Sequence, residues 1–189
     1  MTKKRLGFAL CGSFCTHRQA LDALRALAER YEIVPILSEN VRDTDTRFGS
    51  AAVLTEQIAG ICGRDPVTSI IHAEKFGPAD PLDLLLICPC TGNTAAKMAN
   101  GVTDTTVTMA AKAHLRSDRP LVIALASNDA MSANFRNIGT LLGRKHVYFV
   151  PMRQDDPAKK PHSLVADFEK CLAAVEMAEK GEQMRPLFL

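Results

Sequence analysis

The sequence predicts an α/β fold with three layers: a doubly wound parallel sheet, Rossmann-like or flavodoxin-like, with helices on both faces. Apolar runs that suit buried strands alternate with segments of helical periodicity, and each run ends at a glycine, a serine or a proline. Strands that are apolar on both faces are typical of parallel sheets covered by helices on both sides. With 189 residues, 47% of them hydrophobic, the chain is expected to form a single domain over residues 1–189.

The first half of the chain shows strand and helix patterns in alternation. An apolar run at 6–11 ends at Gly12, and helical spacing of apolar residues follows over 16–30. A second strand is expected at 33–37, followed by a polar segment and a helix that ends at Gly63. A short apolar run over 67–71 and a turn-rich piece then lead to the strongest strand pattern, at 82–88.

The second half repeats the alternation. Helices are expected around 94–100 and 105–115, a strand at 121–126, a helix that ends at Gly143, and a strand at 147–150. A final amphipathic helix is expected over about 163–180. The charged, proline-rich stretch 152–161 predicts a loop within the domain, which either covers a ligand site or simply connects to the last helix.

Composition excludes several classes of function. The formal net charge is +2 and the basic residues are scattered, so the chain lacks the cationic surface of a nucleic-acid-binding protein. The apolar run near the N-terminus is too short for a signal peptide or a membrane span, which predicts a cytoplasmic protein without a membrane partner. The six cysteines form no Cys-x-x-Cys pair, and we therefore predict reduced thiols and no metal site.

Small polar residues follow four of the predicted strands. In an open parallel sheet, ligands bind beyond the carboxyl ends of the strands, where helix N-termini can hold a phosphate. Each segment taken alone also suits a helix cap, because serine, threonine, asparagine and aspartate are the favoured capping residues. Together they predict one ligand site, and the segments are Gly12-Ser13-Phe14, Ser38-Glu39-Asn40, Pro89 to Thr94, and Ser127 to Met131.

The first of these loops limits the choice of cofactor. It lacks the Gly-x-Gly-x-x-Gly fingerprint, so this chain alone is not expected to bind a nicotinamide dinucleotide. FMN needs only one phosphate position, which Gly12 and Ser13 with Ser38 could supply. His72 could transfer a proton, although a histidine chosen from sequence alone is more often structural or solvated.

Two sequence boxes resemble those of the flavin-containing cysteine decarboxylase superfamily. That superfamily carries a histidine, then Pro-x-Ser-Ala-Asn-Thr with a trailing Lys-x-Ala-Asn-Gly, and later Pro-x-Met-Asn-x-x-Met. The first box is similar to His72, Pro89 to Thr94, and Lys97 to Gly101 here. The second has a partial match in Asn128 and Met131, because its proline and first methionine are replaced by Leu125 and Ser127. The resemblance covers about residues 5–150, and the missing residues disfavour a decarboxylase substrate.

Within that superfamily, residues 88–94 and 125–130 are similar to segments of the B subunits of dipicolinate synthases. This resemblance implies synthesis of dipicolinic acid from dihydrodipicolinate or hydroxytetrahydrodipicolinate in the mother cell of a sporulating bacterium. It implies an A subunit as partner, NAD(P) bound only through that partner, and a homo-oligomer. The alternatives are a stand-alone FMN-dependent flavoprotein of the decarboxylase kind and a non-catalytic partner that stabilises the A subunit.

The resemblance assigns roles to individual residues. His72 and Asn128 take catalytic places, and Met131 lies in the substrate box. A small dicarboxylate substrate also needs cations, for which Arg47 and Lys97 are candidates, although charged residues in such positions are more often simply solvated. The expected FMN site consists of Gly12, Ser13, Ser38, Pro89, Thr91, Gly92, Asn93 and Thr94.

Overall fold

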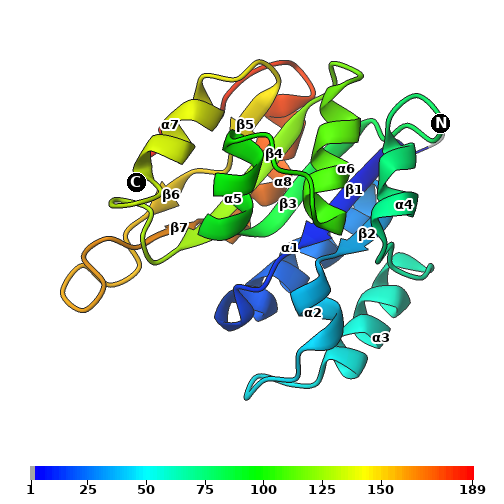
Figure 1. Cartoon of the computed structure of the whole chain (residues 1–189), viewed down its shortest axis with the longest axis horizontal. Coiled ribbons are helices and arrows are strands. Elements are labelled where there is room, and N and C mark those ends of the chain that lie inside the picture. Colours follow the sequence, from blue (N-terminus) through cyan, green and yellow to red (C-terminus); the bar gives the residue numbers. More distant parts are fainter. Residues whose placement is uncertain (1–2) are drawn as a thin grey trace.

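A seven-stranded sheet forms the middle layer of the computed structural model, which describes residues 3–189 (Figure 1). The strand order is β2-β1-β3-β4-β7-β6, and β5 also pairs with β4. Five strands are parallel: β1 (Arg5–Leu10), β2 (Glu32–Leu37), β3 (Leu84–Thr91), β4 (Leu121–Ser127) and β5 (Val147–Phe149). The short strands β6 (Met152–Arg153) and β7 (Leu164–Ala166) are antiparallel to each other, and β7 is antiparallel to β4.

Helices cover both faces of this sheet, and two separate hydrophobic clusters form the core between the layers. One face is covered by α4 (Ile70–Ala73), α5 (Gly92–Ala99), α6 (Thr106–Leu115) and α7 (Phe135–Leu142). The other is covered by α1 (His17–Arg30), α2 (Glu39–Asp43), α3 (Ala51–Cys62) and α8 (Cys171–Ala178). Single turns η1 (Phe14–Thr16), η2 (Glu74–Phe76) and η3 (Phe168–Lys170) complete the elements. The predicted doubly wound α/β fold is confirmed.

Hydroxyl residues start several of the helices, and two of these helices, α2 and α5, directly follow strands. Ser38, Thr91 and Thr105 are the N-caps of α2, α5 and α6, and each accepts a hydrogen bond from a main-chain N–H of the first turn. At the end of α3, Gly63 adopts φ +66, a left-handed conformation that glycine reaches without a steric cost.

Two expectations about the C-terminal third need correction. The sheet is mixed rather than wholly parallel, because β7 returns antiparallel beside the carboxyl half of β4. The helix expected over 163–180 is confined to Cys171–Ala178, and its expected first turn is the strand β7. Val165 pairs with both Ala126 and Arg153, so two long-range partners override the local helical periodicity. The predicted loop at 152–161 begins with β6, and residues 154–163 then connect β6 to β7.

Both ends of the sheet are covered by short extended segments. Beside β6, the main-chain N–H of Met152 donates to the carbonyl of Leu187 at 2.8 Å, and the N–H of Leu189 donates to the Met152 carbonyl at 3.0 Å. Beside β2, Val67 exchanges hydrogen bonds with Pro35 and Leu37 at 2.8 and 2.9 Å. The short apolar run that begins at Val67 is therefore a single bridge to β2, followed by α4.

Candidate functional site

The four polar segments lie next to one another because the strands that precede them are neighbours in the sheet. The main-chain N–H of Ser38 donates to the Leu10 carbonyl at 3.0 Å, and that of Cys11 donates to the Pro89 carbonyl at 3.2 Å. Gly92, after β3, lies against the side chain of Ser127 at the end of β4. The carboxyl ends of β2, β1, β3 and β4 therefore meet at one edge, as the topology of parallel sheets requires.

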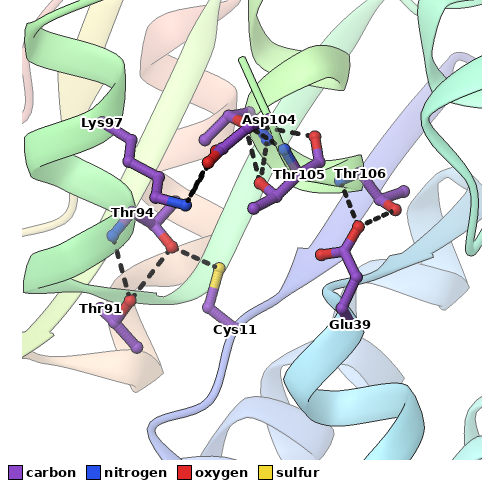
Figure 2. A network of polar contacts seen from close by, with 9 residues as sticks. Cys11, Glu39, Thr91, Thr94, Lys97, Asp104, Thr105 and Thr106 are labelled. Atoms are coloured by element: carbon purple, nitrogen blue, oxygen red, sulfur yellow. Dashed lines mark hydrogen bonds and ion pairs between the residues drawn. The ribbon is translucent and has the colours of Figure 1, made fainter. Parts of the chain in front are cut away.

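The Pro89–Thr94 segment is divided between a strand and a helix. Pro89 and Thr91 belong to β3, which extends three residues beyond the expected end, and α5 begins at Gly92. The Thr91 hydroxyl accepts from the Thr94 N–H at 3.2 Å and donates to the Thr94 hydroxyl at 3.0 Å (Figure 2). The Thr94 hydroxyl donates in turn to the Cys11 sulfur at 3.3 Å. These hydroxyls therefore fix the start of α5 against β1.

Cys11 lies at the centre of this contact, and its thiol is fully buried. Burial raises the pKa of Cys11 to about 11, and the hydrogen bond from Thr94 opposes this only in part. The thiol is therefore protonated at neutral pH. A protonated, buried thiol is a packing group rather than a nucleophile.

A buried histidine at the start of α1 binds the main chain of the loop between β1 and α1. His17 Nε2 donates to the Cys11 carbonyl at 2.9 Å, and burial lowers the pKa of His17. The neutral ring can make this bond, so no charge enters the loop. In the same loop the half-buried Ser13 makes no side-chain hydrogen bond within residues 3–189. The Ser13 hydroxyl is therefore available to a ligand.

The loop after β4 is organised by a carboxylate that the sequence patterns did not reveal. Asp129 accepts from the Ser127 hydroxyl at 2.5 Å and from the Asn134 amide at 2.8 Å. These two hydrogen bonds lower the pKa of Asp129, which is therefore ionised at neutral pH. Asn137 donates to Asn134 at 2.8 Å, which links the loop to α7.

Gly92 is the point where α5 meets this network. A methyl group at Gly92 would lie 2.4 Å from Ser127 Oγ, 2.7 Å from Asn134 Nδ2 and 2.9 Å from Asp129 Oδ1. All three distances are shorter than a normal van der Waals contact. Glycine is therefore required here for close packing between the two segments, and its backbone needs no positive φ.

Two charged groups near the site are engaged within the chain (Figure 2). Glu39 Oε1 accepts from both the N–H and the hydroxyl of Thr106, each at 2.8 Å, so this carboxylate caps the N-terminus of α6. Lys97 Nζ donates to both oxygens of Asp104, at 2.8 and 3.0 Å, and this lowers the pKa of Asp104. A substrate carboxylate at Lys97 would have to compete with Asp104.

The other predicted site residues differ in how closely they approach the strand ends. Asn93 and Asn128 are exposed on two of the four segments, and neither side chain has a hydrogen-bond partner within residues 3–189. His72 is exposed on α4, which packs against α6 rather than on the four segments. Arg47 lies in the α2–α3 connection, with its guanidinium 4.9 Å from the centre of the Phe48 ring. The main-chain N–H of Met131 donates to the carbonyl of His162 at 2.9 Å.

A cavity lies beside these segments. It has a volume of about 610 Å³ and lies between the start of α1 and the connection from α2 to α3. Phe14 and Phe48 are among its lining residues, but none of the residues from Pro89 to Thr94 is. Of the four segments, this cavity therefore borders the first one, at Phe14.

Sequence reasoning missed the groups that hold the site in place. Asp129, Asn134 and His17 bind main-chain or side-chain groups of the four segments, and Asn137 in turn holds Asn134. Of these, only Asp129 carried a signal, because it follows a predicted strand end. Within residues 3–189, no group of three or more metal-ligating side chains is present and no helix is long and apolar enough to cross a membrane.

Comparisons with known proteins agree with this architecture. The chain is 40% identical over 187 residues to the B subunit of dipicolinate synthase from Bacillus subtilis (strain 168), a match that covers 98% of this chain and 94% of the relative. The crystal structure of the dipicolinate synthase B subunit from Bacillus halodurans has a TM-score of 0.91 at 40% identity, covering 100% of this chain and 97% of the other. The crystal structure of the FMN-dependent cysteine decarboxylase SpaF has a TM-score of 0.67 at 26% identity, and the match covers 94% of this chain and 98% of the other.

The resemblance predicted from the Pro89–Thr94 box is thereby confirmed. The family model described as Flavoprotein matches residues 1–180, which include all four strand-end segments. The chain therefore belongs to the Flavoprotein family.

Proposed function

We propose that the chain acts as the B subunit of a dipicolinate synthase, together with a nicotinamide-binding A subunit. The pair would convert dihydrodipicolinate, or hydroxytetrahydrodipicolinate, to dipicolinic acid. The observation that carries this proposal is the 40% identity, over 98% of the chain, to a relative that bears that name. A homo-oligomer of this chain, which the resemblance implies, is part of the same proposal.

FMN is the proposed cofactor of this chain. The chain belongs to the Flavoprotein family, and the 26% identical SpaF is described as FMN-dependent. The strand-end site fits such a group, because Ser13, Asn93 and Asn128 offer a hydroxyl and two amides that no other side chain occupies within residues 3–189. Glu39, the acidic residue of the second segment, accepts hydrogen bonds at the N-terminus of α6. The partial positive charge of that helix end offsets the carboxylate, which reduces its repulsion of a phosphate in the site.

Each candidate side chain has a specific task in this proposal. Ser13 and Ser38 would hold the phosphate, and Asn93 and Asn128 would orient the flavin ring and the substrate carboxylates by hydrogen bonds. FMN, when bound, supplies a two-electron redox group. Formation of the aromatic ring also releases a proton, for which His72 is the proposed acceptor.

The purified protein is expected to bind FMN, and Ser13→Ala with Asn93→Ala should weaken that binding about tenfold or more. Each substitution removes one hydrogen bond to the cofactor, and a hydrogen bond to a charged phosphate contributes about 1.5–3 kcal/mol. Quenching of flavin fluorescence on titration measures the dissociation constant. Ser117→Ala is the matched control, because Ser117 lies after α6, outside the four segments. A protein that shows no affinity for FMN would instead favour a non-catalytic partner of the A subunit.

Replacing His72 by asparagine is expected to lower dipicolinate formation about a hundredfold or more in the reconstituted pair of subunits, because loss of a general base costs about 10²–10⁴ in rate. Ultraviolet absorption of the product measures the rate, and size-exclusion chromatography checks that the pair still assembles. Lys75→Ala, on the same exposed segment, is the control for local disturbance. Unchanged turnover in the His72 variant would remove this residue from the proposed chemistry, and turnover without the A subunit would favour a stand-alone flavoprotein.

A further inference from the structure

A second pocket lies in the helix layer that contains α5, α6 and α7. It has a volume of about 420 Å³, within the range of pockets that bind small molecules. Its lining comes from the C-terminal end of α5, the following residues 101–103, α6 with its C-cap Arg116, and Arg144 just beyond the end of α7. None of the residues that line this pocket belongs to the four strand-end segments, so it is distinct from the candidate flavin site.

The charges around this pocket are all of one sign. Lys112, Arg116 and Arg144 line it, and no aspartate or glutamate does. Lys112 and Arg116 are four residues apart on α6, so they are neighbours on one helix face, where like charges repel by about 0.2–0.5 kcal/mol. Neither side chain has an ion pair or a hydrogen bond within residues 3–189. Such an arrangement is favourable when an anion binds between the cations.

Arg144 brings the third charge from a different element. Its Nη1 donates to the carbonyl of Met98 at 3.3 Å, which places the guanidinium over the C-terminal end of α5. This bond accounts for one N–H of the guanidinium, and the others remain for a ligand. A cation at the C-terminus of a helix stabilises that helix, which accounts for Arg144 at the end of α5. This effect does not account for the position of Lys112 and Arg116 beside Arg144.

Part of the pocket lining is apolar. It includes the buried Met98 and Ala111, the half-buried Leu115 and the exposed Val102. An inorganic anion would leave this surface in contact with water. An anion with a hydrocarbon framework would cover it and gain about 25 cal/mol for each Å² of apolar surface removed from water.

We propose that this pocket binds a compact organic dianion. Lys112, Arg116 and Arg144 hold its two carboxylates, and its hydrocarbon part lies against Met98, Val102 and Leu115. The site is separate from the candidate flavin site, so the proposal does not depend on the reaction that the chain performs.

The test uses benzene-1,3-dicarboxylate as the probe and the full-length chain, with isothermal titration calorimetry. Saturable binding to the native chain is expected, and the double variant Lys112→Ala with Arg116→Ala should bind at least about tenfold more weakly, since it removes two charge-assisted contacts. The variant should fold normally, because alanine is the best helix former and neither side chain has a partner within residues 3–189. Benzoate, with one carboxylate, and inorganic phosphate, without an apolar part, should both bind more weakly than the probe.

The control variant is Lys145→Ala, which removes an exposed cation next to Arg144 that does not line the pocket. It should bind the probe with native affinity. Methyl NMR should show shifts at Val102 and Leu115 on titration. Absence of saturable binding, equal affinity in the double variant, equal affinity for phosphate, or NMR shifts confined to the four strand-end segments would each overturn the proposal.

Discussion

Gly92→Ala is expected to destabilise the protein by about 2 kcal/mol and to weaken ligand binding at the strand-end site, because overpacking a dense contact costs about 1–3 kcal/mol. The new methyl group would lie 2.4 Å from Ser127 Oγ and 2.9 Å from Asp129 Oδ1. These atoms cannot retreat independently, because Asp129 holds both Ser127 and Asn134 by hydrogen bonds. The loop that carries Asn128 must therefore shift. Urea unfolding and FMN titration measure the two effects.

Gly139→Ala is the matched control for this experiment. Gly139 lies within α7, and a methyl group there would meet no atom within 4 Å. The change should leave stability unaltered or raise it by up to about 1 kcal/mol, the difference in helix propensity between glycine and alanine. Adding Ser127→Gly to the Gly92 variant removes the closest contact and should recover part of the loss. Equal stability of the Gly92 and Gly139 variants would show that the loop adjusts without cost.

Lowering the pH from about 6.5 to about 4 is expected to remove about 3 kcal/mol of stability through a single buried histidine. Burial lowers the pKa of His114 to about 4, from an ordinary value of 6.5. Its Nε2 donates to the Pro120 carbonyl at 2.8 Å, and its buried Nδ1 has no partner within residues 3–189, so the folded protein holds the neutral ring. Between these pH values the unfolded chain binds a proton that the folded chain does not. The free energy of unfolding is therefore not reduced by His114 above about pH 6.5, and it decreases as the pH is lowered toward 4.

The variant His114→Gln isolates this effect. A glutamine amide can still donate to the Pro120 carbonyl but does not titrate. The slope of the free energy of unfolding against pH should therefore decrease by the equivalent of about one bound proton in this window. Urea unfolding at several pH values measures the slope. His162→Gln, which changes an exposed histidine, is the control for the substitution itself. An unaltered slope in the His114 variant would mean that other groups cause the acid sensitivity.

The fold could be predicted where local pattern and tertiary environment agree. The run 82–88 is apolar at nearly every position because β3 is covered on both faces, and such a run has few alternatives to a central strand. The C-terminal third could not be predicted in the same way. Leu164, Val165 and Phe168 fit a helical spacing, yet the partners that make 164–166 a strand are Ala126 and Arg153, distant in sequence.

The grouping of the four strand-end segments could be predicted, but the contacts of their side chains could be predicted only in part. The rule that ligands bind at the carboxyl ends of parallel strands located the four segments correctly, because it depends only on strand order. The partners of individual side chains depend on contacts that no local pattern contains. Thus the hydroxyls of Thr91 and Thr94 are used within the chain, and Lys97 is paired with Asp104. The assignments to Asn93, Asn128 and His72 stay predictions.

The segments that cover the outer strands β2 and β6 limit how copies of this chain can associate. The C-terminal residues occupy the free side of β6 at Met152, and Val67 occupies the side of β2 between Pro35 and Leu37. The main-chain donors and acceptors at these positions are already used, and an exposed edge is what allows one chain to add a strand to another. Sheet augmentation is therefore blocked at these positions. On the third outer strand, β5, the Gln183 side chain binds both the N–H and the carbonyl of Phe149. A homo-oligomer of this chain could not add a strand at any of these positions, and its geometry would depend there on side chains rather than on a shared sheet.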